Sequence, residues 1–410
     1  MTVPQHRQTD LESALGGVPA IRSVGTEERR LVVIWQDRAR SVFPFIWLRD
    51  NCACPACRHP GNGQRLLDVL DIPADIAAHE VSLLPTGEVA IRWKPDGHAS
   101  RYAAAWLAGH EFSPEARAGR RPHPRLWGAE MANDPPSAEW AAFERSPAAE
   151  RRGLELLHDY GFLVLHDVPV ESGMVVRVGD RLGHVRVTNY GRCFDVISVP
   201  NPNNLAYTAI ALGVHTDNPY RDPTPGLQLL HCLEAGAPGG DSLLVDGFAA
   251  AEALRRADRA AFDLLARLPL PFRFADKDAD LQARTPVISV DFDGEVTGVH
   301  LNSRSMAPLD APEELVETWN AAYRAFVALL HRSAGELRLR LAPGDLLIME
   351  NNRVLHGRDA FDPNAGCRHL QGCYVDKDGV DSRRRVLSRE SGATTAGTEP
   401  RGPAWPSPAR

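Results

Sequence analysis

GVHTDNPYRDPTPGLQLLHCL, residues 213–233, is the stretch from which the fold and the chemistry of this chain can be worked out. It contains a His-x-Asp pair, His215 and Asp217, followed by an apolar run that is typical of a buried strand. In an extended segment, residues i and i+2 project to the same side. One imidazole and one carboxylate can therefore reach a single metal ion.

The segment 349–358, MENNRVLHGR, offers a third ligand in His356, just past an expected strand. Two histidines and one carboxylate on one face of a metal ion leave three coordination positions open. This is the facial triad of non-haem Fe(II) oxygenases, in which the open positions take co-substrate and O₂. By itself, one His-x-Asp pair among fifteen histidines is expected by chance.

Two further residues lie at spacings that favour a metal site. Ser242 follows Asp217 by 25 residues, and Arg368 follows His356 by 12. An arginine one strand away from the last ligand can hold a carboxylate through two parallel hydrogen bonds, as the distal carboxylate of 2-oxoglutarate requires. The alternative is an exposed strand arginine, and the joint spacing favours the anchor.

The rest of the chain predicts an α+β protein with a mostly β core. Apolar runs in 29–48 and a hairpin in 81–93 predict a small β-rich domain, and a Pro/Arg/His-rich stretch after it predicts a linker. Beyond the linker, we expect helices at 137–160, 249–268 and 312–330 and strands at 161–166, 226–233, 242–245, 345–349 and 369–375. Strands around the candidate site with helices between them suit a barrel-like or double-sheet core buttressed by helices.

The predicted domain boundaries follow from these elements. They are a flexible N-terminus (1–28), a small zinc-binding domain (29–112), a linker (113–136), an oxygenase domain (137–390) and a disordered tail rich in Gly, Pro, Thr and Ala (391–410).

Composition excludes several classes of function. The net charge is −7 and no Lys/Arg-rich run is long enough to form a phosphate-binding stripe, so nucleic acid is not an expected partner. No apolar run approaches the roughly 20 residues that span a bilayer. The first residues lack the apolar core of a signal peptide, so we expect a cytoplasmic protein.

Three of the seven cysteines lie within six residues, Cys52, Cys54 and Cys57. In a reducing compartment this clustering favours a metal over disulfides. Three thiolates and one more donor make a closed tetrahedral zinc site, and the fourth ligand is either His59 or His98. A tight turn that already holds three ligands is strained in delivering His59. The zinc would stabilise a domain too small for a large core. Three unrelated buried thiols are the alternative.

The string from His215 to Ser242, with the later His-Gly-Arg and Arg-His-Leu-x-Gly-x-Tyr, resembles the γ-butyrobetaine and trimethyllysine hydroxylase family. These are taurine-dioxygenase-like Fe(II)- and 2-oxoglutarate-dependent oxygenases. The resemblance covers most of the chain and implies a double-stranded β-helix, or jelly roll, and the three iron ligands above. It also implies that Arg368 holds 2-oxoglutarate, with Ser242 and Leu230 beside it, and that His98 completes the zinc site.

The same resemblance implies the reaction and its setting. O₂ and 2-oxoglutarate are consumed, a C–H bond of a small zwitterion is hydroxylated, and succinate and CO₂ are released. γ-Butyrobetaine or a related trimethylammonium compound is the first choice of substrate. Ascorbate stimulation and a homodimer are further expectations from the family.

Substrate-binding candidates are aromatic and polar residues at positions that match the family's motifs. Aromatic faces attract a trimethylammonium group through cation–π interactions. The candidates are Tyr190, Phe194, Asn204, Tyr207, Asn218, Asn302, Arg304 and Tyr374. Each aromatic residue alone is more often a core residue.

The chain also departs from the family in this region. It has Phe194 where the γ-butyrobetaine enzymes carry tryptophan and Asn218 where they carry an aromatic residue. It also has Ser303 within the segment Leu301-Asn302-Ser303-Arg304, which corresponds to the family's asparagine-containing motif. The asparagines, Arg304 and Arg221 could therefore orient an anionic group, so a hydroxylase of a short aminophosphonate or another amino-acid derivative is the alternative. Two non-enzymatic readings remain: a cupin-like binding protein, and an interaction module built on the cysteine cluster.

Overall fold

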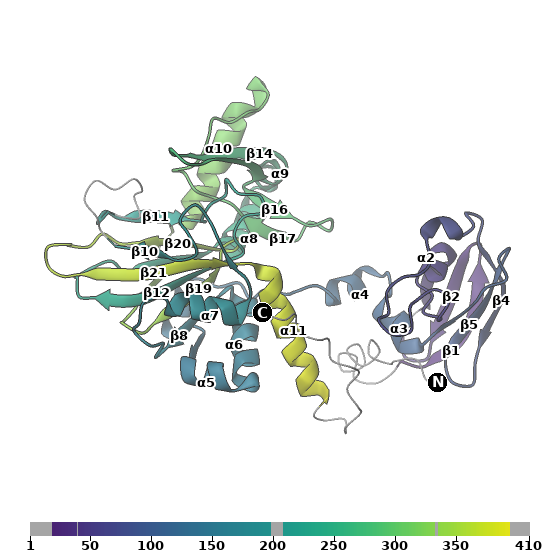
Figure 1. Ribbon diagram of the computed structural model, residues 1–410. Coiled ribbons are helices and arrows are strands. Elements are labelled where there is room, and N and C mark those ends of the chain that lie inside the picture. Colours follow the sequence, from purple (N-terminus) through teal and green to yellow (C-terminus); the bar gives the residue numbers. More distant parts are fainter. Residues whose placement is uncertain (1–18, 39, 198–207, 333–334, 394–410) are drawn as a thin grey trace. The chain divides into compact units, whose positions relative to one another are not determined.

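The computed structural model describes residues 19–38, 40–197, 208–332 and 335–393. The chain divides into two compact units, Met1–Pro122 and His123–Arg410, and Figure 1 shows their ribbons. The division falls inside the stretch 113–136, for which the sequence predicts a linker. Helices and strands are both abundant, so the α+β class is confirmed.

The first unit contains two three-stranded antiparallel sheets, β1-β2-β3 and β4-β5-β6, that share one apolar core. Its elements are β1 (Ile21–Glu27), β2 (Arg30–Trp35), β3 (Arg40–Pro44), α2 (Phe45–Asp50), the 3-10 helix η1 (Val69–Asp71), β4 (Ala77–Leu83), β5 (Val89–Lys94), β6 (Ala99–Tyr102), α3 (Ala104–Gly109) and α4 (Pro114–Gly119). The predicted hairpin in 81–93 is the β4–β5 pair.

Two segments of this unit differ from the sequence-based predictions. Strand β1 lies within 1–28, which was expected to be flexible; it pairs with β2 although Ile21 is its only fully buried residue, so its sequence lacks an apolar alternation. The apolar run 29–48 was expected to be strand, but its end forms α2. Pro44 has no N–H for a sheet ladder, and Phe45 and Leu48 bury one helix face at a spacing of three.

The second unit is built on two sheets. The larger sheet has the order β10-β21-β12-β19-β8-β7 with β9 paired to β21, and the smaller has the order β11-β20-β13-β18. All neighbours are antiparallel except β7 and β8. The strands of these sheets are β7 (Ser137–Glu139), β8 (Phe162–His166), β9 (Val185–Arg186), β10 (Phe194–Val196), β11 (Leu212–His215), β12 (Leu227–Ala235), β13 (Ser242–Asp246), β18 (Glu336–Leu339), β19 (Leu346–Glu350), β20 (Val354–Arg358) and β21 (Arg368–Val375).

Helices and two hairpins complete the second unit. They are η2 (Ala129–Asn133), α5 (Trp140–Arg145), α6 (Pro147–Tyr160), α7 (Met174–Leu182), α8 (Gly247–Ala257), α9 (Arg259–Arg267), β14 (Pro269–Ala275), β15 (Asp280–Pro286), β16 (Ile288–Val290), β17 (Val296–Val299), α10 (Glu313–Leu330) and α11 (Lys377–Ala393). Among the described residues, no helix is both long and apolar enough to cross a membrane.

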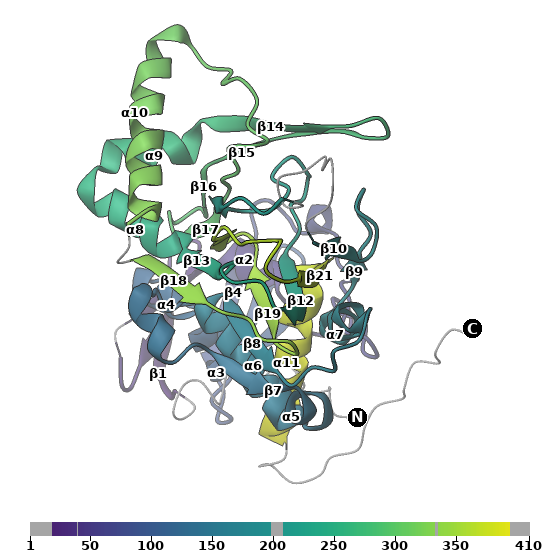
Figure 2. The same ribbon diagram turned by 90° about the vertical axis from the view of Figure 1, so that its left-hand side faces the viewer.

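The apolar cores place the helices on the outer faces of the sheets. Helices α5, α6 and α7 pack with β8, β12 and β19 in one cluster and gather on one face of the larger sheet (Figure 1). Helices α8, α9 and α10 pack on the side of the smaller sheet (Figure 2). A third cluster joins the two sheets through Leu230, Leu347 and Leu370 of the larger and Leu244 and Leu337 of the smaller.

Two helices that the sequence predicts as continuous are interrupted. The segment 137–160 becomes β7, α5 and α6, because Pro147 cannot continue a helix and Ser146 caps the next one by accepting from the Ala149 N–H. The segment 249–268 breaks at Asp258, whose carboxylate accepts from the Ala261 N–H at 2.9 Å. The predicted tail 391–410 is described only in its first three residues, which end α11.

Candidate active site

The three expected iron ligands come together at the smaller sheet. His215 ends β11 and stands opposite His356 of β20 in the strand register, and Asp217 follows two residues later. Their ligand atoms all lie within 4.8 Å of one another. His215 Nε2 is 3.3 Å from Asp217 Oδ1. His356 was expected just past a strand, but it lies inside β20 because the turn after β19 is only three residues long.

Backbone contacts fix the segment that carries His215 and Asp217. Nδ1 of His215 lies 3.0 Å from the Gly213 carbonyl, which fixes the proton there and leaves Nε2 facing Asp217. Asn351 accepts from the Asp217 N–H at 2.7 Å and donates to the Asp217 carbonyl at 2.9 Å. The Leu301 carbonyl accepts a hydrogen bond from the N–H of Thr216, the residue between His215 and Asp217. The pair therefore sits in a segment bonded on both sides.

The electrostatics of the three side chains suit a divalent cation. Burial alone would raise the pKa of Asp217, but the close approach of His215 and the proximity of His356 hold it well below its usual range. Burial, and then repulsion from His215, lowers the pKa of His356 to about 3. An ionised carboxylate and a neutral imidazole are the protonation states in which these groups bind metals.

A cavity of about 440 Å³ opens beside the triad. Its lining mixes aromatic, cationic and apolar side chains with the three candidate ligands. Among the expected residues, Tyr190, Phe194, Asn218, Leu230, Ser242, Asn302, Arg304, Arg368 and Tyr374 all line it. Asn204 and Tyr207 lie outside the described residues.

Arg368 carries an uncompensated charge into this cavity. Its side chain is 9% exposed, and its Nε donates to the Gly240 carbonyl at 3.1 Å. Within the described ranges, no carboxylate lies within ion-pair distance of it. Gly240 has φ +75°, and a Cβ there would lie 2.8 Å from Cδ of Arg368, so only glycine lets the arginine pass. Ser242 and Leu230 line the same cavity. The group is placed to receive an anion.

Arg358 is a second buried arginine of the cavity, which the sequence analysis missed. It donates to the Thr208 and Ile210 carbonyls at 2.6 and 2.9 Å. Burial, followed by repulsion from Arg368 and Arg304, lowers its pKa to about 10. Because it lies two residues after His356 in the same strand, the period of two could have predicted its inward direction.

Five aromatic rings line the cavity. Tyr190, Phe194 and Tyr374 were expected; Tyr220 and Phe274 were not. The ring centroids of Phe194 and Tyr374 are 5.3 Å apart, those of Tyr190 and Phe274 are 6.0 Å apart, and Tyr220 stacks on Phe274 at 5.3 Å. These five residues are called the aromatic wall below.

The polar candidates divide into engaged and available groups. Asn302 donates to the Thr216 carbonyl at 3.1 Å and accepts from the Arg304 N–H at 3.2 Å, so its amide serves the scaffold. Asn218 accepts from the Tyr220 hydroxyl at 2.6 Å, while its Nδ2 is buried without a partner among the described residues. Arg304 lines the cavity with no carboxylate in ion-pair distance in the described part of the chain.

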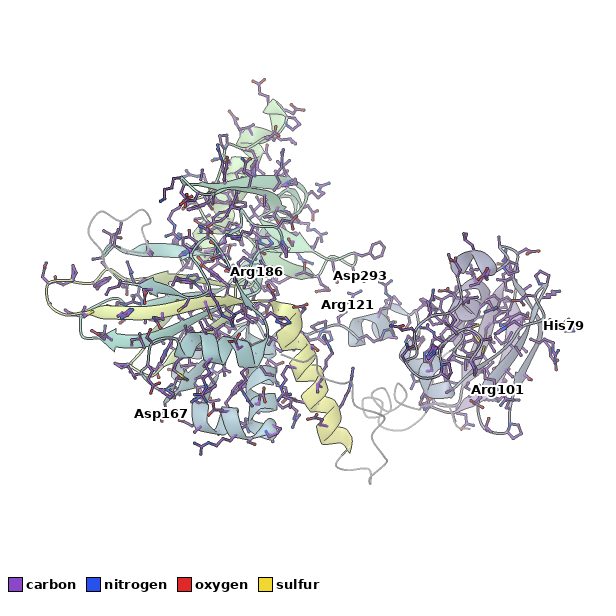
Figure 3. All side chains as sticks on the ribbon, viewed as in Figure 1. His79, Arg101, Arg121, Asp167, Arg186 and Asp293 are labelled. Carbon is purple, nitrogen blue, oxygen red and sulfur yellow. The ribbon has the colours of Figure 1, made fainter. Side chains whose placement is uncertain are left out.

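Two further candidates from the sequence, Arg221 and Ser303, lie away from the cavity. Arg221 donates to Asn189 and is not part of the lining, and Ser303 is exposed. Figure 3 labels Arg186 and Asp293; Arg186 pairs with Asp376 at 3.0 Å, and neither labelled residue lines the cavity.

Comparison with known proteins agrees with this geometry. The model of the taurine catabolism dioxygenase TauD, TfdA family matches residues 119–374, and that of the γ-butyrobetaine hydroxylase-like N-terminal domain matches residues 23–108. The chain belongs to the TauD, TfdA family. This member of the family is accordingly a dioxygenase that uses Fe(II) and 2-oxoglutarate to act on a small molecule.

Individual relatives of this dioxygenase match along most of both chains. γ-Butyrobetaine dioxygenase of Pseudomonas sp. (strain AK-1) is 39% identical over 87% of this chain and 93% of its own length. γ-Butyrobetaine dioxygenase of Homo sapiens is 32% identical with the same two coverages. Trimethyllysine dioxygenase of Meyerozyma guilliermondii is also 32% identical, over 87% of this chain and 93% of its own.

The first unit of the dioxygenase holds a second group of metal-binding side chains. Nε2 of His98 lies 3.3, 3.5 and 3.6 Å from the sulfurs of Cys52, Cys54 and Cys57. Three thiolates and one imidazole within 4.8 Å of one another fit a closed tetrahedral zinc site. His59 is not part of the group, and its Nδ1 accepts from the Gly61 N–H.

Arg49 connects the cysteines of this second group to His98 through hydrogen bonds. It is 5% exposed; its Nη1 donates to Cys57 Sγ at 3.3 Å and its Nε to Asp96 at 3.0 Å. Asp96 in turn accepts from the His98 N–H at 3.0 Å. Three thiolates with a divalent ion carry a net negative charge, which the guanidinium offsets.

Proposed function

We propose that this dioxygenase hydroxylates a small betaine, with γ-butyrobetaine or a related trimethylammonium compound as substrate and succinate and CO₂ as co-products. We also propose that its two sheets form the double-stranded β-helix of the family. Relatives named γ-butyrobetaine dioxygenase and trimethyllysine dioxygenase support the substrate class. The chain's own cavity supports it independently.

The observation that carries the proposal is that one cavity combines the aromatic wall with Arg304 and Arg368, which have no carboxylate within ion-pair distance in the described part of the chain. Five ring faces attract a quaternary ammonium group, which cannot form ordinary hydrogen bonds. Arg304 and the unpartnered amide of Asn218 offer hydrogen bonds to a carboxylate. A zwitterion with both groups matches the lining, whereas a simple cation leaves Arg304 without a partner.

His215, Asp217 and His356 are proposed to hold the iron, and Arg368 to hold the distal carboxylate of 2-oxoglutarate. Iron and 2-oxoglutarate, when bound, supply the oxidation of an unactivated C–H bond by O₂. The chain's residues supply position and dryness. Arg368 orients the co-substrate with Ser242 beside it, while Leu230 and other apolar lining residues exclude water.

A short aminophosphonate is the second candidate substrate. Arg304 and Asn218 suit a phosphonate as well as a carboxylate, and Phe194 and Asn218 replace larger aromatic residues of the γ-butyrobetaine enzymes. An aminophosphonate without methyl groups would make little use of the aromatic wall, so the betaine is preferred.

The test is a substrate screen that follows succinate release by the iron- and zinc-loaded full chain. γ-Butyrobetaine and shorter or longer betaines are compared with the matching phosphonates at equal concentration. We expect the betaines to stimulate succinate release most. Stimulation by phosphonates alone would reverse the order of the two candidates. No visible charge-transfer band on anaerobic addition of Fe(II) and 2-oxoglutarate to the folded protein would refute the oxygenase itself.

The remaining proposals concern the first unit and the setting. Cys52, Cys54, Cys57 and His98 are proposed to bind a structural zinc ion, which metal analysis of the purified protein tests. A cytoplasmic location, a homodimer and stimulation by ascorbate stay predictions from the sequence; fractionation, light scattering and turnover with and without ascorbate measure them.

A further inference from the structure

The two carboxylate oxygens of Asp217 have different surroundings. Oδ1 faces Nε2 of His215 at 3.3 Å. Oδ2 accepts from Nε2 of Gln228 at 2.6 Å and from the hydroxyl of Tyr374 at 2.7 Å. A carboxylate oxygen has about two lone-pair sites, so both sites of Oδ2 are filled by the protein. Only Oδ1 remains for a metal ion.

The two donors to Oδ2 are held by the larger sheet, whereas His215 and His356 belong to the smaller one. Gln228 of β12 and Tyr374 of β21 are direct partners in the strand register. Each is only 4% exposed. Directly opposed residues of an antiparallel pair keep a fixed separation, so the sheet sets the spacing of the two donors. The larger sheet therefore orients a carboxylate whose partner ligands lie on the other sheet.

Tyr374 also belongs to the aromatic wall. Its ring centroid is 5.3 Å from that of Phe194. Phe194 stands opposite Gly372 in the β10–β21 register, and a Cβ on Gly372 would lie 2.5 Å from the Phe194 ring. The absence of a side chain at Gly372 thus lets Phe194 lie beside Tyr374. One residue contacts the wall with its ring and the carboxylate with its hydroxyl.

We infer that Gln228 and Tyr374 are positioning residues that hold Asp217 as a one-oxygen ligand, and that Tyr374 transmits occupation of the aromatic wall to the iron. This inference rests on the proposed function, because it requires iron at Asp217. A carboxylate bound through both oxygens would take one of the three positions that co-substrate and O₂ need. A cation over the Tyr374 ring polarises its hydroxyl and strengthens the hydrogen bond to Oδ2, which draws charge from Oδ1.

The first experiment measures Fe(II) affinity anaerobically on the zinc-loaded full chain with saturating 2-oxoglutarate, through the visible charge-transfer band. Tyr374→Phe keeps the ring and removes the hydroxyl. Tyr190→Phe is the matched control, because it removes a hydroxyl of the same wall that contacts Tyr220 at 3.3 Å instead of Asp217. Loss of one such outer partner typically weakens metal binding at least about tenfold. We expect that loss for Tyr374→Phe and Gln228→Leu and less than about twofold for Tyr190→Phe.

The second experiment adds tetramethylammonium to the same anaerobic complexes, with its binding measured separately by calorimetry. We expect the band to shift in the wild type and in Tyr190→Phe, and not in Tyr374→Phe at the same fractional saturation. A merely structural role for Tyr374 would change stability without removing this spectral response.

The outcomes separate this inference from the proposed function. A wild-type protein without any band refutes the iron site itself. A normal wild-type band with unchanged Fe(II) affinity in Tyr374→Phe and Gln228→Leu overturns the positioning role. No shift on tetramethylammonium addition in the wild type, or an equal shift in Tyr374→Phe, overturns the transmission. Variants are compared only where zinc content and the circular dichroism spectrum match the wild type.

Discussion

Arg353 and Asp246 form an ion pair from which water is excluded, and its removal gives the sharpest stability prediction. The exposed fractions of the two side chains are 1% and 0%, and their nearest atoms are 3.1 Å apart. The other hydrogen bonds of Arg353 go to the Asp159 carbonyl at 2.8 Å and the Arg125 carbonyl at 2.6 Å. The pair ties the chain before α5 and the end of α6 to the turn that leads into β20, the strand of His356.

The magnitude follows from what Arg353→Met leaves behind. Asp246 keeps the Trp127 and Phe248 N–H groups as donors, but its charge stays buried without a cation, and two carbonyls lose their donor. Breaking a buried pair in this way costs about 3–5 kcal/mol. We expect the free energy of unfolding of the second unit to fall by that amount. The double variant with Asp246→Asn should lose at least about 1 kcal/mol less than the sum of the two single losses, because it no longer buries an unpaired charge.

The assay is urea unfolding followed by circular dichroism. The transition of the second unit is the one that Fe(II) and 2-oxoglutarate shift. Arg338→Met is the control, since Arg338 is 56% exposed and pairs with Glu336 at 2.7 Å and with Asp359, and exposed pairs of this kind are each worth at most about 1 kcal/mol. A loss below about 1 kcal/mol for Arg353→Met, or strictly additive losses in the double variant, would refute the reasoning.

Three further predictions concern ligands and zinc. Arg368→Gln should raise the KM for 2-oxoglutarate about a hundredfold, the equivalent of about 3 kcal/mol for a lost buried charge pair, whereas Ser242→Ala should raise it less than about tenfold. Both KM values are measured in steady-state succinate assays, and equal effects of the two variants would contradict the role of Arg368 as the 2-oxoglutarate anchor. Arg304→Gln should raise the KM of the betaine about tenfold or more and leave that of 2-oxoglutarate unchanged; a change in both means that Arg304 does not select the substrate. Arg49→Gln should release zinc to a chelator at least about tenfold more readily than the wild type. The control is Arg101→Gln, because Arg101 is an exposed arginine of the same unit, and equal release from both variants would show that Arg49 does not support the metal.

Short motifs carried most of what the sequence revealed about the candidate site. Strand periodicity is a local property, and it places side chains two residues apart on the same side. It therefore sufficed to interpret the His-x-Asp pair and the later His-Gly-Arg, and the spacing to Arg368 is likewise a local feature of the sequence. The CxCxxC cluster is local as well, and only the choice between His59 and His98 needed the fold. His98 is the one whose ring reaches all three sulfurs.

The residues that the sequence analysis missed are those brought in by distant strands and loops. Phe274 comes from the β14–β15 hairpin. Gln228 lies in an otherwise apolar strand, and nothing in the sequence of that strand indicates its role. Asn351 contacts Asp217 from a turn 134 residues away. No local pattern distinguishes such residues from ordinary strand or turn residues, because their roles depend on which element lies opposite.

The helix breaks were readable in principle. Pro147 and Asp258 carry known stop and cap signals, yet the apolar periodicity on either side continues in phase and masks them. Strand β1 could not be recognised from its own residues, since its pairing with β2 rather than its apolar pattern holds it in the sheet.

The sequence alone predicted the kind of chemistry, because the two-residue spacing of the candidate ligands His215 and Asp217 and the twelve-residue spacing from His356 to Arg368 are set by covalent connectivity. It also indicated the zinc cluster and the division into two units. The orientation of Asp217 depends on the fold, because its second oxygen accepts hydrogen bonds from Gln228 and Tyr374 of the opposite sheet. The same fold brought the five rings of the aromatic wall together from separate strands and loops. The physical reason is that hydrogen bonds and ring contacts act over a few ångströms in space, whatever the separation along the chain.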